Sequence, residues 1–180
     1  LQRVYKSRIK NLLWMSDSTK EKALNKLNGF EKKIGYPDKW KDYAGVHVER
    51  HDHFNNIKQL KIYEFKRELA KIDKPVDKTE WFMNASEVNA YYNPSFNEIA
   101  FPAGILQPPF FNNAADDAIN YGAIGSVIGH EMTHGFDDEG RQYDADGNLH
   151  DWWTANDAEE FNQKAKVVVD QYNAYTVLDS

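Results

Sequence analysis

The stretch VIGHEMTHGFDDEGRQYD, residues 127–144, carries two histidines four residues apart, with a glutamate directly after the first. Apolar residues at helical spacing predict a helix from about 114 to 136, with the His-Glu-Met-Thr-His motif of residues 130–134 in its last two turns. A helix turns about 100° per residue, so His130 and His134 would project from one face, one turn apart. Glu131 would be rotated from that face and lie beside it.

This spacing is typical of a zinc site. Two imidazole nitrogens one turn apart can both reach a Zn²⁺ ion at about 2.0–2.1 Å. Glu131 could then act as general base toward a water molecule that the metal acidifies. Asp137 lies three residues after His134 and could hold the other ring nitrogen of that histidine. Two interpretations without a metal stay open. The two histidines could be an ordinary surface or core pair, and Asp137 could belong to an acidic helix end without a specific role.

Zinc of this kind needs a third protein ligand. The extended pattern with a third histidine fails, because Gly140 stands where that histidine would fall. A glutamate on a later helix is the other common arrangement. Only Glu159 and Glu160 lie on such a predicted helix, and neither is followed by the aspartate that commonly supports such a ligand. Both stay open as candidates, but we expect the third ligand beyond Ser180.

The composition of the chain limits the classes of protein to which it can belong. The 180 residues are 41% hydrophobic and 28% charged, which predicts one soluble globular domain. A net charge of -6 without a basic block argues against a nucleic-acid partner. No apolar run approaches the length of a membrane span. The absence of cysteine excludes disulfides and thiolate metal sites. From its ends at Leu1 and Ser180 we expect the chain to be a piece of a longer protein.

Hydrophobic periodicity predicts an α+β fold that is mainly α-helical. Residues 1–78 are predicted to be helical, and residues 79–180 to hold a strand hairpin, the HExxH helix and a following helix. The predicted helices lie at about 3–15, from a capping box at 18–21 to a stop at Gly29, at 52–72, at 114–136 and at 154–172. Short strands are predicted at 87–92 and 98–101, giving a β-hairpin or edge strand beside the HExxH helix.

Several segments together carry a family resemblance. They are NLLWM (11–15), KIGYPDKW (33–40), NAYY (89–92), NEIAFPAGILQPPFF (97–111), NYG (120–122), VIGHEMTHGFDD (127–138), GR (140–141) and DWWT (151–154). The set resembles the catalytic domain of the neprilysin family of zinc endopeptidases, which includes bacterial PepO-type enzymes. The resemblance covers the whole chain. It implies a zincin-like (gluzincin) catalytic-domain fragment, peptide substrates, one Zn²⁺ per site and an extracytoplasmic location.

The resemblance also implies roles at matching positions. His130 and His134 would be zinc ligands, Glu131 the general base and Asp137 the carboxylate that orients His134. The third ligand would come from a later Gly-Glu-Asn-Ile-Ala-Asp-like segment, in the part of the catalytic domain missing after Ser180. We therefore expect residues 1–180 alone to bind zinc weakly and to show negligible peptidase activity.

Substrate contacts follow from the same resemblance. Asn89 and Ala90 would hydrogen-bond the substrate backbone and add it as an extra strand. Ile105, Phe110 and Val127 would line the pocket for the residue after the cut, although they could equally be core. Ser126 stands where neprilysin has a larger apolar residue, which leaves the pocket depth open.

Two rival functions stay open. The chain could be a non-catalytic peptide-binding or interaction module with an incomplete metal site. It could also be a zinc hydrolase that acts on something other than peptides. The stretch Asp144–Asn148 hints at a calcium loop, but Leu149 and Ala155 stand where that loop needs glycine and glutamate, so a turn is expected.

Overall fold

The computed structural model describes residues 1–176, so the last four positions of the predicted 79–180 portion lie outside the described residues. The chain divides into two compact units. The first, which we call the sheet unit, contains Leu1–Tyr36 and the chain from Met83 onward; the second, the inserted unit, is Pro37–Phe82. Neither boundary falls at the predicted division between residues 78 and 79, and the assignment of the whole chain to one catalytic domain stays a prediction.

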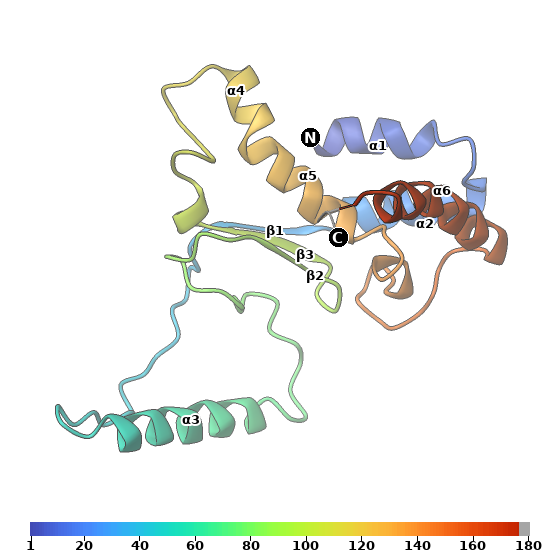
Figure 1. The fold of residues 1–180 in the computed structure, drawn as a ribbon. Helices are drawn as coiled ribbons and strands as arrows, with labels where there is room; N and C mark the ends of the chain where they lie inside the picture. Colours follow the sequence, from blue (N-terminus) through green and yellow to red (C-terminus); the bar gives the residue numbers. More distant parts are fainter. Residues whose placement is uncertain (177–180) are drawn as a thin grey trace. The chain divides into compact units, whose positions relative to one another are not determined.

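The sheet unit is mainly helical with one small sheet, which confirms the predicted fold class (Figure 1). Its elements in order are α1 (Gln2–Lys10), α2 (Asp17–Asn28), β1 (Glu31–Gly35), β2 (Tyr91–Asn93), β3 (Glu98–Pro102), the 3₁₀ turn η1 (Ala103–Ile105), α4 (Asp117–Gly122), α5 (Ile124–His134), the 3₁₀ turn η2 (Gly140–Gln142) and α6 (Ala155–Asn173). Among the described helices, none has both the length and the apolar character that a membrane span requires.

The three strands lie in the order β1-β3-β2. β2 and β3 form the predicted antiparallel hairpin, with Tyr91 opposite Ala100. β1 runs parallel to β3 on its other side and was not predicted, because its sequence Glu-Lys-Lys-Ile-Gly carries three charges. Its central Lys33 is buried and forms an ion pair with the fully buried Glu98 of β3. Lys33, which its charge would place at the surface, is therefore buried against a carboxylate of opposite charge.

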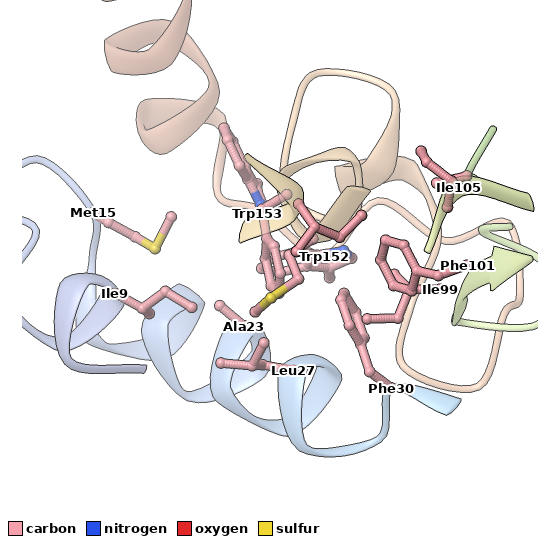
Figure 2. Close-up of a cluster of buried hydrophobic side chains, with 14 residues drawn as sticks. Ile9, Met15, Ala23, Leu27, Phe30, Ile99, Phe101, Ile105, Trp152 and Trp153 are labelled. Carbon is pink, nitrogen blue, oxygen red and sulfur yellow. The ribbon is translucent and has the colours of Figure 1, made fainter. Parts of the chain in front are cut away.

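The core of the sheet unit lies between α2, the sheet and the loop before α6 (Figure 2). Leu27 belongs to the apolar stripe of α2, Phe30 lies between α2 and β1, and Trp152 and Trp153 come from the loop. Phe136, two residues past α5, stacks on Phe30 with ring centroids 5.7 Å apart. The end of the HExxH helix is therefore fixed by aromatic contacts to the N-terminal part of the chain.

The predicted helix at 114–136 is in fact two helices. The backbone of Ala123 leaves the helical region, with φ -92° and ψ -95°, and separates α4 from α5. The N–H of Ile124 donates to the carbonyl of Phe110, 2.8 Å away, instead of to the preceding turn. This bond fixes the start of α5 against the segment that carries Phe110.

A buried carboxylate joins the starts of α2 and α6. Asp157, whose side chain is fully buried, accepts hydrogen bonds from the N–H and hydroxyl of Ser16 and from the hydroxyls of Thr19 and Thr154. Thr154 also caps α6, as predicted, by accepting from the Asp157 N–H at 3.1 Å. The capping box predicted at 18–21 does not form, because α2 begins at Asp17 and Thr19 donates to Asp157 instead.

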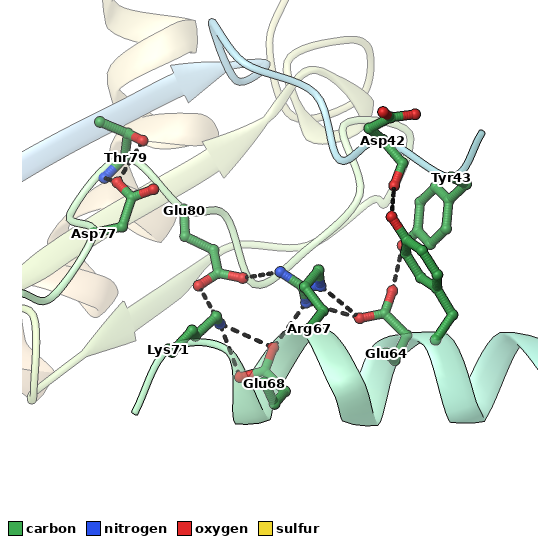
Figure 3. Close-up of polar contacts among 10 residues, drawn as sticks. Asp42, Tyr43, Glu64, Arg67, Glu68, Lys71, Asp77, Thr79 and Glu80 are labelled. Atoms are coloured by element: carbon green, nitrogen blue, oxygen red, sulfur yellow. Dashed lines mark hydrogen bonds and ion pairs between the residues drawn. The ribbon is translucent and has the colours of Figure 1, made fainter. Parts of the chain in front are cut away.

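The inserted unit contains one long helix, α3 (His53–Leu69), close to the predicted range. Asp52 caps it by accepting from the N–H of Asn55. A charged network lies along one side of α3, where Arg67 pairs with Glu64, Glu68 and Glu80 (Figure 3). The apolar side chains that predicted this helix are exposed within the described residues: Phe54, Ile57, Leu60, Ile62, Phe65 and Leu69.

Candidate metal and substrate site

The two histidines of the quoted stretch converge on one point. His130 and His134 both lie in α5, and their Nε2 atoms are 3.0 Å apart. Two imidazole nitrogens bound to one tetrahedral zinc at about 2.05 Å would lie about 3.3 Å apart. Both side chains are exposed, so a metal ion could reach them. The donor atoms present therefore fit two positions of a zinc site.

Asp137 contacts the ring nitrogen of His134 that does not face His130. Its Oδ2 lies 2.9 Å from Nδ1 of His134. Its Oδ1 accepts the backbone N–H groups of Glu139 at 3.1 Å and Gly140 at 2.7 Å. A carboxylate anchored in this way accepts a hydrogen bond from the Nδ1–H group and leaves the Nε2 lone pair of His134 free for a metal.

Glu131 lies beside the histidine pair with only 7% of its surface exposed. Burial raises the pKa of its carboxyl above the ordinary value, and the two neighbouring histidines and the backbone N–H of Tyr92 oppose that shift. The bond from Tyr92 ties Glu131 to β2, the edge strand of the sheet. A carboxyl whose pKa is raised above its ordinary value is better suited to accept a proton and release it again.

A cavity of about 540 Å³ opens beside these residues. Its lining residues are Val88, Asn89, Ile105, Phe110, Ser126, Val127, His130 and Glu131. Four of these residues are apolar, namely Val88, Ile105, Phe110 and Val127, and the other four are polar, His130 and Glu131 among them. This combination is typical of a site that binds an apolar side chain next to a reacting group.

Gly104 allows the cavity wall to form. Its N–H donates to the carbonyl of Ala85 at 2.8 Å. A Cβ atom at Gly104 would lie 2.4 Å from the carbonyl oxygen of Glu87, so only glycine fits. The close approach brings Ile105, next in the chain, beside the segment that leads to Asn89.

Asn89 and Ala90 immediately precede β2. β2 pairs only with β3 among the described strands, so its other edge faces away from the sheet. Asn89 is exposed, whereas Ala90 is buried and its N–H is bonded to the Asn89 side chain at 2.9 Å. The position before an open strand edge is where an extended peptide could be added.

Comparisons with known proteins agree with this geometry. The family model described as Peptidase family M13 matches residues 89–180, and a second M13 model matches residues 1–37. The chain belongs to peptidase family M13. The M13 chain is 44% identical over 98% of its length to an endothelin-converting enzyme homolog of Locusta migratoria. Human neprilysin is 40% identical over the same share.

Solved structures give the same assignment. The crystal structure of the Mycobacterium tuberculosis zinc metalloprotease ZMP1 with an inhibitor is 54% identical over 97% of the M13 chain, with a TM-score of 0.91, and the chain covers 27% of that structure. The M13 chain spans about a quarter of the curated relatives it matches, 25% of the locust protein and 24% of human neprilysin. These likenesses confirm the gluzincin fold predicted from the sequence.

The structure brings most of the predicted site residues together. Asn89, Ile105, Phe110 and Val127 line one cavity with His130 and Glu131. Ala90, His134 and Asp137 do not line it. Ala90 follows Asn89 in the chain, His134 contacts the lining residue His130, and Asp137 contacts His134. Val88 was missed, although it lies two residues before Ala90 in the strand predicted at 87–92 and would share a face with it.

The third ligand is not found among the described residues. Within residues 1–176 no three His, Cys, Asp or Glu side chains gather where they could hold one metal ion. Glu159 and Glu160 therefore do not join His130 and His134. The expectation of a ligand beyond Ser180 stays a prediction.

Proposed function

We propose that this chain is part of a zinc-dependent endopeptidase. The convergence of His130 and His134 beside Glu131, next to a cavity that His130 and Glu131 line together with apolar side chains, carries the proposal. The printed names of its relatives support it, because they include a zinc metalloprotease and neprilysin. The third ligand would be supplied by sequence beyond Ser180. Such an enzyme would act outside the cytoplasm, as the resemblance to the neprilysin family implies.

Each side chain has a distinct task in this proposal. When bound, zinc would polarise the scissile carbonyl and acidify a water molecule. Glu131 would accept the proton of the attacking water and deliver it to the leaving amine. Asp137 would keep His134 in the tautomer that presents Nε2 to the metal.

The substrate would be held in two ways. Asn89 and Ala90 would bond the peptide backbone as an added strand beside β2. The side chain after the cut would enter the cavity lined by Ile105, Phe110 and Val127. The cavity volume of about 540 Å³ has room for a large apolar side chain.

The exchange of Glu131 for Gln tests the general base. In the full-length protein, Glu131→Gln is expected to lower kcat by about 10²–10⁴-fold and to leave the zinc content unchanged. Glu159→Gln, on exposed α6, is the matched control and should retain both zinc and activity. Peptide hydrolysis by Glu131→Gln at the wild-type rate would refute the assignment.

The incomplete ligand set favours one alternative, a peptide-binding module without catalysis. Calorimetry separates the two functions. The full-length protein should bind zinc tightly and cleave peptides, whereas residues 1–180 alone should bind zinc weakly and cleave none. Peptide binding by the full-length protein without zinc uptake or cleavage would establish the alternative.

A further inference from the structure

Among the described residues of the sheet unit, Lys26 is the most deeply buried cation without a carboxylate partner. Its side chain is 1% exposed. Its Nζ donates to two backbone carbonyls, those of Gly140 and Tyr143, each at 2.6 Å. The rings of Tyr92 and Trp152 lie 5.7 and 5.6 Å from it. Within residues 1–176 no carboxylate oxygen lies within ion-pair distance of Lys26.

The burial of this charge is unfavourable for folding. Burial lowers the pKa of Lys26 to about 8, against the opposing attraction of Asp137 and Asp144. A methionine would have the same reach without the desolvation cost. A side chain that served only to fill this space would therefore be apolar, which suggests that the ammonium has another task.

The two carbonyls belong to the loop that holds the metal site. Gly140 accepts from Lys26 through its carbonyl and donates through its N–H to Oδ1 of Asp137, at 2.7 Å. Oδ2 of Asp137 lies 2.9 Å from Nδ1 of His134. A continuous chain of hydrogen bonds thus runs from Lys26 through Gly140 and Asp137 to a candidate ligand.

The loop also presses on the end of α5. A Cβ atom at Gly140 would lie 1.9 Å from the carbonyl oxygen of His134. The contact leaves no room for the loop to shift toward the helix. Lys26 bonds the loop through Gly140 and Tyr143, and so restricts its movement at a second point.

We propose that Lys26 is a positioning residue of the metal site, which fixes the loop from Gly140 to Tyr143 so that Asp137 holds His134 in its ligating orientation. This inference rests on the proposed zinc peptidase function. Lys26 itself touches neither the cavity nor the histidines. Its action is transmitted through Asp137, and it should affect metal affinity and turnover more than substrate binding.

The test compares Lys26→Met with Lys22→Met in the full-length protein. Lys22 lies one turn earlier in α2, is exposed, and donates to the nearby Trp152 carbonyl at 3.4 Å. Zinc affinity is measured by competition with a chelator, alongside kcat, KM and the urea midpoint. Lys26→Met is expected to raise the zinc Kd by about 10–100-fold and to lower kcat with little change in KM. Lys22→Met should match the wild type.

A double-mutant cycle with Asp137→Asn separates positioning from general stability. If Lys26 acts through Asp137, the effect of Lys26→Met on zinc Kd should fall to less than about threefold in the Asp137→Asn background. If the double variant raised the zinc Kd by the product of the two single-variant effects, the inference would be overturned. If Lys26→Met is insoluble, Lys26→Arg, which keeps the charge, replaces it in the same cycle with the same criterion.

These experiments test the role of Lys26 separately from the proposed zinc peptidase function. A wild-type protein that cleaves peptides, with a Lys26→Met variant that binds zinc as tightly as Lys22→Met, overturns the role of Lys26 alone. A full-length wild type that neither binds zinc nor cleaves peptides overturns the proposed function and this inference with it.

Discussion

Replacing Asp157 by Asn is expected to lower the free energy of unfolding by about 2–4 kcal/mol at neutral pH. Burial alone would raise the pKa of this carboxyl, but bonds from Ser16, Thr19 and Thr154 outweigh it and lower the pKa to about 2. The difference from the ordinary value of 3.8 corresponds to about 2 kcal/mol. Asparagine also replaces one acceptor oxygen by an N–H₂ group, opposite three hydroxyl donors.

The pH dependence follows from the direction of that shift. Because the folded-state pKa is depressed, the ionised carboxylate stabilises the fold fully above about pH 4. This contribution is lost as the pH falls through about 2. At pH 3 about 1 kcal/mol of it should remain. The stability difference between wild type and Asp157→Asn should narrow accordingly.

Urea unfolding measures both effects. Trp14 and Trp153, whose ring centroids are 5.6 Å apart beside α6, report the transition by fluorescence. Asp170→Asn is the matched control, because Asp170 is exposed on the same helix and, within residues 1–176, its one ion pair is with Lys166. Its effect should stay below about 0.5 kcal/mol. An Asp157→Asn variant as stable as this control at pH 7, or a difference that does not narrow below pH 4, would refute the reasoning.

Two further substitutions test backbone contact and buried charge. Gly140→Ala should lower the unfolding free energy by more than about 3 kcal/mol and weaken zinc binding, because its Cβ would meet backbone oxygen of His134 at 1.9 Å. Urea titration should show no such loss for Gly122→Ala, where nothing lies within 4 Å. Lys33→Met should cost about 3–5 kcal/mol by leaving Glu98 buried without its partner, and adding Glu98→Gln should restore most of the loss. Burial already raises the pKa of Glu98, so the single variant should be less destabilised at pH 5 than at pH 8, since the carboxyl can then be protonated.

Local signals in the sequence predicted much of the site. The spacing of His130, Glu131 and His134 within a helix needs no tertiary information, and Asp137 is close enough in sequence to be placed by the same geometry. The Thr154 cap and the Gly29 stop are equally local. Such features depend on residues within about one helical turn of each other, which is the range at which sequence patterns are informative.

The features that sequence reasoning missed depend on distant partners. β1 is a strand because Lys33 meets Glu98, 65 residues away, and neither charge indicates burial by itself. The break at Ala123 arises because Phe110 accepts the N–H of Ile124. Lys26 has the sequence context of an exposed helix residue, and only its contacts with the loop after α5 reveal another role.

The parallel pairing of β1 with β3 has a consequence for how the protein folds. The whole inserted unit lies between the two strands in sequence, so the sheet closes only when a long segment is looped out. Contacts this far apart form slowly, and sheet closure is expected to be a late step. The entropic cost of such a loop rises only by about 0.6 kcal/mol for each doubling of its length. A change in the length of the stretch between residues 37 and 82 should therefore alter the entropic cost of closing this sheet only slightly.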